Sequence, residues 1–256
     1  MQTEHKQTVD DGEPIKWNFS VEAYMSQTYD FSDDSLNALY QKTKANQWDV
    51  NTDIDWSYEL NPDNPLGMPD GTLLIYGTDV WNKMNEQNRA EIRHHSQGWT
   101  LSQVLHGEQA ALICASKLAV AEESLSARLC AAGQIIDEAR HIEAFGRLVN
   151  NKLPISYPMS KALKGLLQDT IPTDKLDMTN LGMQVLVEGI ALSLFQSMVA
   201  YTKDPFIKDL MTRIQRDEAR HFAIGRITLG SVYKEMSSTE RKEREEFVVE
   251  GAYTLY

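Results

Sequence analysis

A short motif that occurs twice is the feature that most restricts how this chain can fold. Residues 137–141 read Asp-Glu-Ala-Arg-His, and residues 217–221 repeat the same five residues. Each copy contains Glu-x-x-His, and in an α-helix two side chains three residues apart project from the same face. The motif therefore predicts two helices that each present a carboxylate and an imidazole from one side.

A further glutamate precedes each copy of the motif at the same distance. Glu108 lies 30 residues before Glu138, and Glu188 lies 30 residues before Glu218, so the two sets are offset by 80 residues. If each upstream helix packs antiparallel to its motif helix, the turn falls midway between them. Both midpoints carry helix-start residues, Ser124 or Ser126 in the first half and Asp204-Pro205 in the second. Each glutamate then stands about 15 residues, or roughly 22 Å, from its turn. This spacing predicts a duplicated helical hairpin.

The four predicted helices are apolar on one face, except where these glutamates and histidines interrupt the pattern. A carboxylate in an apolar stripe is costly to bury unless it is paired or bound to a metal. We therefore expect two metal ions, held by Glu108, Glu138, His141, Glu188, Glu218 and His221. Oxygen and nitrogen ligands without a thiolate suit iron or manganese better than a structural zinc. The alternative is a metal-free scaffold in which the same residues form buried ion pairs.

Composition limits the other functions that the chain can have. The net charge of −12 argues against binding to nucleic acids or anionic membranes, and 42% hydrophobic content indicates an ordinary globular protein. No apolar run approaches the roughly 18 residues of a membrane span, and the polar first residues do not resemble a signal peptide. Cys114 and Cys130 have no metal-type spacing, so reduced core thiols are expected. These features favour a cytoplasmic protein.

The rest of the chain is predicted to add helices around the bundle. Residues 1–30 are polar and form an arm, and residues 31–256 form one helical domain with a metal-binding core at about 97–235. The expected fold is all-α, a four-helix bundle with extra N-terminal and C-terminal helices. The further helices are expected at about 33–48, 79–94 and 160–168 and from Ser237 onward, and the ligand-bearing helices are expected to include 97–123 and 178–202. Trp48 and Trp56 should anchor an ordered loop by packing against the bundle.

The region from about Trp99 to Arg226 resembles the ferritin-like superfamily of di-iron carboxylate proteins, which includes ribonucleotide-reductase small subunits and related oxidases and oxygenases. The Asp-Glu-x-Arg-His motif is especially similar to that of multicomponent monooxygenase hydroxylases. The resemblance implies that the six residues are di-iron ligands and that Glu138 and Glu218 bridge the ions. It also implies that Asp137 and Asp217 accept hydrogen bonds from the histidines of the opposite motif. Arg140 and Arg220 would neutralise these aspartates, although they could equally form ordinary salt bridges.

Two departures from these families narrow the expectation. Reductase small subunits typically carry a radical tyrosine four residues after the first histidine, where this chain has Phe145. Arylamine N-oxygenases typically add a third histidine one turn before the second motif's glutamate, where this chain has Ile214. A tyrosyl radical is therefore not expected, but a mixed manganese and iron cofactor stays open.

The resemblance implies an enzyme that activates O2 to hydroxylate, desaturate or N-oxygenate a mostly apolar organic substrate. Electrons would come from a separate ferredoxin or flavin reductase, because the chain has no flavin or nicotinamide motif. A homodimer is also possible. The alternative is an iron-binding ferroxidase or peroxide scavenger without an organic substrate, and an apolar cavity beside the metals is expected only for the first function.

Three further histidines and one glutamine lie near the predicted site in the sequence. His106 should point away from Glu108, and His94 and His95 should be solvated. Gln184, one turn before Glu188, could face either the site or the core.

Overall fold

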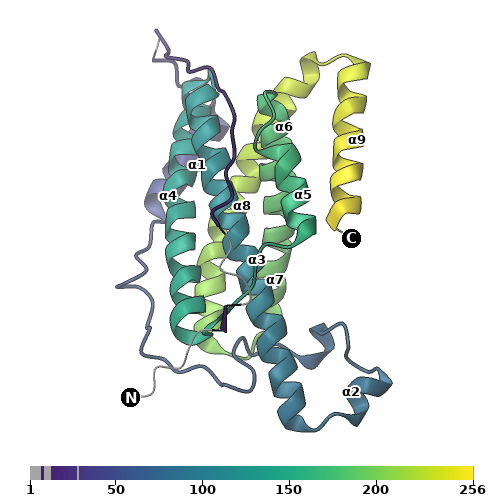
Figure 1. Ribbon diagram of the computed structural model, residues 1–256. Helices are drawn as coiled ribbons and strands as arrows, with labels where there is room; N and C mark the ends of the chain where they lie inside the picture. The colour runs from purple at the N-terminus through teal and green to yellow at the C-terminus, as the bar shows by residue number, and fades with distance from the viewer. Residues whose placement is uncertain (1–6, 9–12, 28, 256) are drawn as a thin grey trace.

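The computed structural model describes residues 7–8, 13–27 and 29–255, and its fold is the predicted all-α bundle (Figure 1). The first hairpin consists of α3 (Glu86–Ala121) and α4 (Leu125–Arg147). The second consists of α7 (Glu188–Tyr201) and α8 (Pro205–Glu235). The two hairpins pack side by side, so that four long helices surround one core.

Both hairpin turns lie where the midpoints predicted them. Ser124 is the N-cap of α4, and its side chain accepts a hydrogen bond from the backbone N–H of Ala127. Asp204 caps α8 by accepting from the backbone N–H of Ile207, and Pro205 occupies the first turn, where its missing N–H has no cost. These caps fix the height of each Glu-x-x-His motif relative to its turn.

The helix that carries Glu188 is not a regular α-helix. It begins with α6 (Leu176–Asn180), continues as a π-helix over Leu181–Val187 and becomes α7 at Glu188. A second π segment, Leu148–Lys152, ends α4. π turns insert an extra residue into a helix and are frequent at functional sites.

The prediction that no segment could span a membrane needs correction. Over an 18-residue window, the helical stretch Leu176–Tyr201 has a mean hydropathy of 1.5, so it is long and apolar enough by length and composition. In this structure it packs against α8 and carries the buried Glu188. One part of the stretch thus packs into the bundle, and 28% of the 18-residue window is buried.

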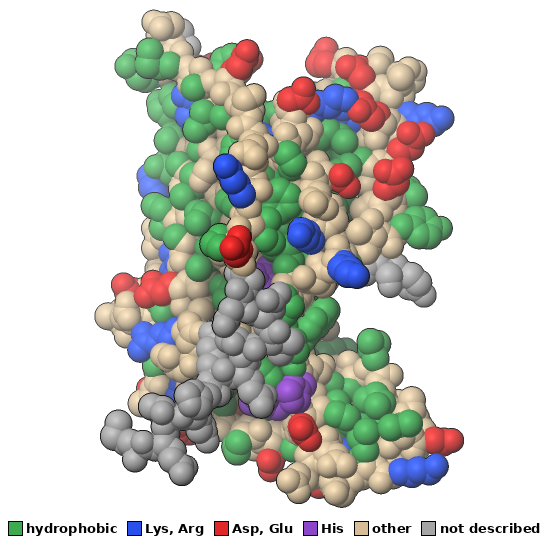
Figure 2. Space-filling view, viewed as in Figure 1, with side chains coloured by type: hydrophobic (Ala, Val, Ile, Leu, Met, Phe, Trp, Pro, Cys, Tyr) green, Lys and Arg blue, Asp and Glu red, His purple; other side chains and the backbone are tan. Residues whose placement is uncertain are grey.

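Shorter elements cover the outside of the bundle. α1 (Asp34–Ala45) packs against α4 and α8, whereas α5 (Lys161–Thr170) and α9 (Ser238–Leu255) pack together and against the π segment at 181–187. A 3₁₀ turn (Asp70–Thr72) and α2 (Asp79–Lys83) belong to an excursion below the bundle (Figure 1). The strands β1 (Gln7–Thr8) and β2 (Ile155–Ser156) form a two-residue parallel pair. Figure 2 shows charged side chains gathered over α9 and apolar ones over the α2 region, where Leu74, Tyr76 and Val80 are exposed.

Some predicted helix ends were wrong. α1 stops at Ala45 rather than Trp48, because the backbone of Asn46 leaves the helical conformation (φ −107°, ψ 20°), and the Asn46 side chain donates to the Lys42 carbonyl. The break expected near residue 95 lies instead at Met84 and Asn85, where the Asn85 side chain caps a single 36-residue helix. His94 and His95 therefore lie within α3 and are half-buried rather than solvated.

The described part of the N-terminal arm lies on the bundle. The backbone N–H of Tyr24 donates to the Val120 carbonyl at 3.3 Å, and Trp17 packs against a small apolar cluster beside α3 and α5. Phe19 lies under the ammonium of Lys117, a buried cation that also donates to the carbonyls of Ile171 and Thr173. The arm and Lys117 together tie the connection after α5 to α3. The division into an arm and one domain stays a prediction.

Candidate metal centre

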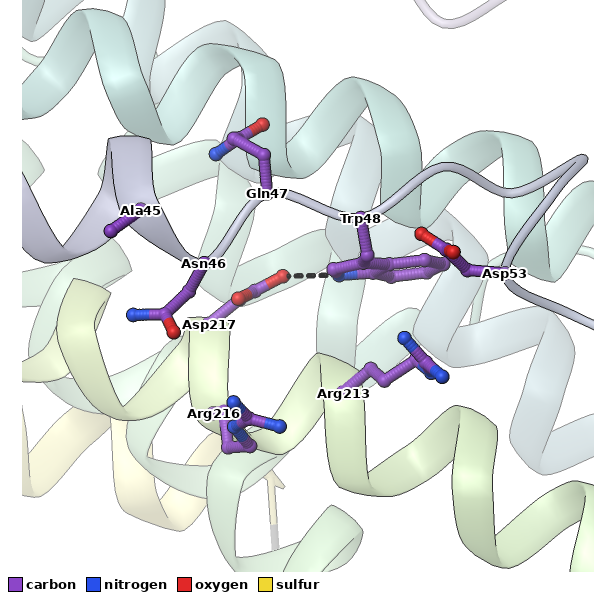
Figure 3. Close-up of a pocket in the computed structure, with 8 residues that line it drawn as sticks. All are labelled: Ala45, Asn46, Gln47, Trp48, Asp53, Arg213, Arg216 and Asp217. Carbon is purple, nitrogen blue, oxygen red and sulfur yellow. Dashed lines mark hydrogen bonds between the residues drawn. The ribbon is translucent and has the colours of Figure 1, made fainter.

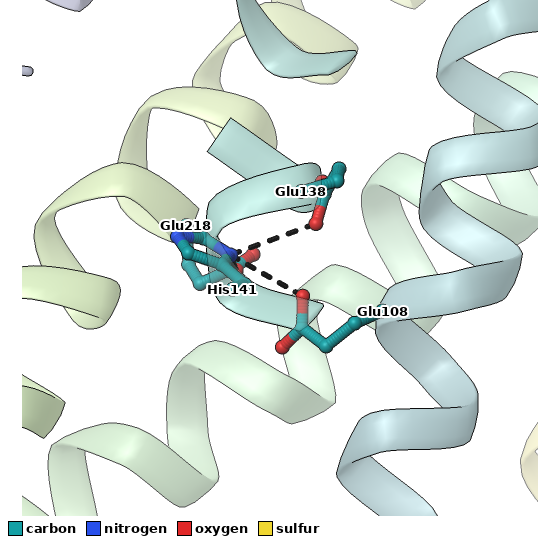
Figure 4. A group of neighbouring side chains, drawn as sticks. All are labelled: Glu108, Glu138, His141 and Glu218. Atoms are coloured by element: carbon teal, nitrogen blue, oxygen red, sulfur yellow. Dashed lines mark hydrogen bonds and ion pairs between the residues drawn. The ribbon is translucent and has the colours of Figure 1, made fainter. Parts of the chain in front are cut away.

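All six predicted ligands come together in the core of the bundle. Glu108 comes from α3, Glu138 and His141 from α4, Glu188 from α7, and Glu218 and His221 from α8. None of these residues is more than 5% exposed. They form two groups that share Glu138, and within each group the ligand atoms lie within 4.8 Å of one another. Figure 4 shows the first group, Glu108, Glu138, His141 and Glu218, converging from three helices.

Each histidine turns one nitrogen toward the glutamates. Nδ1 of His141 lies 3.0 Å from Glu218 and 3.2 Å from Glu108. Nδ1 of His221 lies 3.2 Å from Glu138 and 3.4 Å from Glu218. Glu138 and Glu218 thus lie between the two imidazoles, the position that a bridging carboxylate would need.

The opposite nitrogen of each histidine faces an aspartate of the other motif. Nε2 of His141 lies 3.2 Å from Asp217, and Nε2 of His221 lies 3.2 Å from Asp137. A hydrogen bond from Nε2–H to the aspartate leaves the lone pair of Nδ1 directed at the glutamates. These crossed contacts select the tautomer in which Nδ1 can bind a cation.

Two arginines join the aspartates into one buried network. Arg140 donates to Asp137 at 2.5 Å and to Asp217 at 3.0 Å, whereas Arg220 donates to Asp217 at 2.5 Å and to Asp137 at 3.2 Å. Each arginine therefore contacts the aspartates of both motifs, and the buried pairs connect the two hairpins.

The segment after α1 completes this network from outside. The amide of Gln47 donates to Asp137 at 3.0 Å, and the indole N–H of Trp48 donates to Asp217 at 2.9 Å (Figure 3). A polar cavity of about 220 Å³ borders Trp48 and Asp217 and is also lined by Arg213 and Arg216. Trp48 thus packs against the bundle as predicted, but its hydrogen bond to Asp217 was not foreseen.

Protons balance the charge of the metal-free cluster. Burial raises the pKa of Glu108 and of Glu188 well above the usual value, and the charge of Glu218 adds to both shifts. Burial also acts to raise the pKa of Glu138, but the charge of His221 and close contacts with both histidines hold it well below the usual value. The pKa of Glu218 is lowered to about 2, because its close contacts with Glu188 and His141 and the charge of His221 outweigh burial.

The histidines carry the compensating positive charge. Burial acts to lower the pKa of His141 and His221, but the surrounding carboxylates raise it well above its usual value. When both imidazoles are protonated and protons also neutralise Glu108 and Glu188, the charges of the two motifs cancel. Two histidines and two arginines then balance two aspartates and two glutamates. Metal ions replace such protons when carboxylates and imidazoles bind them.

Several buried ligand atoms lack a hydrogen-bond partner within the described protein. They are Oε2 of Glu138, both carboxylate oxygens of Glu218 and Nδ1 of His221. Buried polar atoms without a partner are rare and costly in folded proteins, and a bound ion can satisfy them. The residues therefore fit a pair of metal ions, and a set of oxygen and nitrogen donors suits iron or manganese.

Two glutamines lie against the cluster, and one of them, Gln134, was not predicted from the sequence. Gln134 donates to Glu138 and to Glu188, each at 2.9 Å, and Gln184 donates to the Gln134 carbonyl oxygen. Gln184 thus faces the site, one of the two orientations left open. Gln134 precedes Glu138 by four residues, as Gln184 precedes Glu188, and this shared spacing was the signal that could have found it.

A cavity of about 410 Å³ lies between α3 and α7 and reaches the carboxylates of Glu108, Glu188 and Glu218. Most of its other walls are apolar and come from Trp99, Val104, Gly107, Ala111, Leu163, Val187, Ile190, Ala191 and Leu194. This is the apolar cavity that separates an enzyme with an organic substrate from an iron-storing protein.

The remaining histidines near the site have other partners. Nε2 of His106 lies 3.0 Å from the Tyr157 carbonyl, so His106 points away from Glu108 as predicted. Nδ1 of His95 contacts the Tyr157 hydroxyl. Ile214 is fully buried in the apolar core at the end of the site opposite Gln134.

The bundle and its buried carboxylate and histidine cluster place this chain among the ferritin-like di-iron proteins, which confirms the predicted superfamily and fold. More specifically, the chain belongs to the AurF family, described as P-aminobenzoate N-oxygenase, whose family model matches residues 31–256. It is thus an oxidoreductase of an oxygenase family that uses O2 on an organic substrate. No curated protein and no solved structure matches the chain.

Proposed function

We propose that this protein is a di-iron enzyme that uses O2 to oxidise a neutral, mostly apolar organic molecule bound in the 410 Å³ cavity. The reaction would be a hydroxylation, desaturation or N-oxygenation. The ligands would be Glu108, Glu138, His141, Glu188, Glu218 and His221, with iron in both positions or manganese in one. The observation that carries the proposal is an apolar cavity that ends at three of the candidate ligands.

Bound iron would supply the redox chemistry that reduces O2, and the chain's own residues prepare the site for it. The two crossed aspartates hold the imidazoles with Nδ1 toward the carboxylates. The apolar core around Phe145 and Phe195 keeps bulk water away from one end of the cluster. In an oxygenation, one atom of O2 enters the substrate and the other leaves as water, so a separate ferredoxin or flavin reductase would provide two electrons.

The cavity favours a neutral substrate over p-aminobenzoate itself. The residues that line it include three glutamates and no Lys, Arg or His. Its amide side chain, Gln103, is already engaged, because it donates to the Pro158 carbonyl and accepts from the Ser160 N–H. Burying a substrate carboxylate there without a cationic partner would cost several kcal/mol. Ile214, in place of the third histidine typical of arylamine N-oxygenases, further separates this chain from that activity.

The test is O2 consumption by iron-loaded, chemically reduced protein in the presence of candidate substrates. Neutral arylamines and medium-chain apolar molecules should accelerate O2 uptake and give a product one oxygen heavier or two hydrogens lighter by mass spectrometry. p-Aminobenzoate should give little or no acceleration. Iron oxidation that is indifferent to every organic molecule would instead favour the ferroxidase alternative.

A further inference from the structure

Residues whose numbers differ by 80 occupy equivalent positions in the two halves of the site. One turn before the candidate ligands, however, the equivalent residues differ in type. One turn before Glu138 lies Gln134, but the equivalent residue before Glu218 is Ile214. One turn before Glu188 lies Gln184, but the equivalent residue before Glu108 is Val104. One end of the cluster therefore carries two amides, and the other end carries two aliphatic side chains.

The two amides are arranged to donate to the carboxylates. Nε2 of Gln134 lies 2.9 Å from Oε1 of Glu138 and 2.9 Å from Oε1 of Glu188, so both of its hydrogens have acceptors. Gln184 donates to Oε1 of Gln134 and thereby keeps the Gln134 nitrogen turned toward the glutamates. Both glutamines are 1% exposed, and in such an interior charge-assisted hydrogen bonds are strong.

The backbone makes room for this arrangement at one end only. A Cβ at Gly225 would overlap Cβ of Gln184, so α8 must carry glycine where Gln184 packs. The residue equivalent to Gly225 in the first half is Phe145, which is fully buried and stacks on Phe195 with ring centroids 5.8 Å apart. The end of the cluster with the two amides therefore packs against a glycine, whereas the equivalent position at the other end is filled by an aromatic ring.

This difference reaches the candidate ligands. Glu138 has one oxygen held by Gln134 and one without a partner, whereas neither oxygen of Glu218 has a hydrogen-bond partner within the described protein. Glu188 is held by the same amide, but the equivalent Glu108 has aliphatic Val104 one turn before it, and its described partner is Nδ1 of His141, itself a candidate ligand. The carboxylates at the amide end are thus oriented before any ion binds.

We infer that Gln134 is a positioning residue that makes the two metal positions unequal, with the ion at Glu188 and His221 bound more tightly than the ion at Glu108 and His141. The inference rests on the proposed function and deepens it. Pre-oriented ligands lose less conformational freedom on binding, and partners that orient metal ligands typically change metal affinity by about 10–100-fold. At the weaker position, the contacts described for Glu108 and Glu218 are with other candidate ligands, and an ion bound there would replace them.

Mn²⁺ binding to the metal-free protein tests this inference without reference to activity. The signal of unbound Mn²⁺ in electron paramagnetic resonance gives the binding isotherm, which should show two ions bound with different affinities. Gln134→Met keeps the length of the side chain but removes both donors, and it should weaken one binding step by about 10–100-fold. Ile214→Met is the matched control at the equivalent position, and both of its affinities should stay within about threefold of wild type.

A converse variant keeps the inference testable if Gln134→Met does not fold, as checked by circular dichroism. Ile214→Gln places an amide one turn before Glu218, whose oxygens lack partners, and it should strengthen the weaker step and bring the two affinities together. The inference is overturned if Gln134→Met binds both ions as wild type does or weakens both steps equally. It is also overturned if Ile214→Gln leaves the gap between the affinities unchanged. If wild-type protein binds fewer than two ions, the proposed function itself fails.

Discussion

Replacing Asp217 with alanine should destabilise the metal-free protein more than removing any ion pair on its surface. Asp217 is 1% exposed, and its carboxylate is the acceptor for four donors. The donors are Trp48 Nε1 at 2.9 Å, Arg140 Nη2 at 3.0 Å, His141 Nε2 at 3.2 Å and Arg220 Nη2 at 2.5 Å. Removing one partner from a buried charge network typically costs about 3–5 kcal/mol, because the other charges stay buried.

Two further variants calibrate this value. Trp48→Phe removes one hydrogen bond to a charged group and should cost about 1.5–3 kcal/mol. Arg213→Ala removes an exposed pair with Asp209, whose side chains are 29% and 55% exposed, and should cost about 0.2–1 kcal/mol. Urea unfolding of metal-free protein, followed by circular dichroism, gives all three values. A cost for Asp217→Ala no larger than that for Arg213→Ala would refute the view that this network holds the two hairpins together.

Four other outcomes are expected. A Cβ at Gly107 meets no atom within 4 Å, so Gly107→Leu should fill part of the cavity and lower kcat/KM by roughly fourfold for each substrate methylene displaced. Gly107→Ala should retain activity, and both variants should still bind Mn²⁺. Burial raises the pKa of Cys114 and Cys130 to about 12, so neither thiol should react with a disulfide reagent at pH 8 until the protein unfolds; rapid labelling of native protein would contradict this. Each Mn²⁺ position should stabilise the fold in urea by about 2.7 kcal/mol when Mn²⁺ is at about 100 times the dissociation constant of that position, and His141→Ala should reduce the total gain. A hydrogen bond from Arg93 lowers the pKa of Asp70. The free energy of unfolding of wild type should therefore exceed that of Asp70→Asn by a constant amount from pH 7 to about 5, and this difference should vanish as the pH falls through the lowered pKa.

The helices and the convergence of six side chains could be predicted because both depend on local patterns. Helical spacing placed Glu138 beside His141, and the caps at Ser124 and Asp204 set the height of each motif. The predicted break in α3 was wrong because polar residues near Gln97 resembled a helix start. In the structure, Gln97 instead bonds outward to the Leu66 N–H and to Asn64.

Features that depend on distant partners could not be predicted in this way. Trp48 and Asp217 are 169 residues apart, and no local pattern links an indole to that carboxylate. The position of Gln134 four residues before Glu138 is a local signal, but its second contact, with Glu188 54 positions later in the chain, has none. The π segment before Glu188 could not be predicted, because its residues, apolar apart from Gln184, show no pattern that distinguishes a π-helix from an α-helix.

The crossed contacts between the motifs also bear on how such a protein could have arisen. Nε2 of His141 faces Asp217, and Nε2 of His221 faces Asp137, so the aspartate partner of each histidine belongs to the other hairpin. A single hairpin with this motif would lack the aspartate partner of its histidine, and a second copy of the same hairpin would supply it. Because both copies lie in one chain, equivalent positions can differ, as Gln134 and Ile214 do.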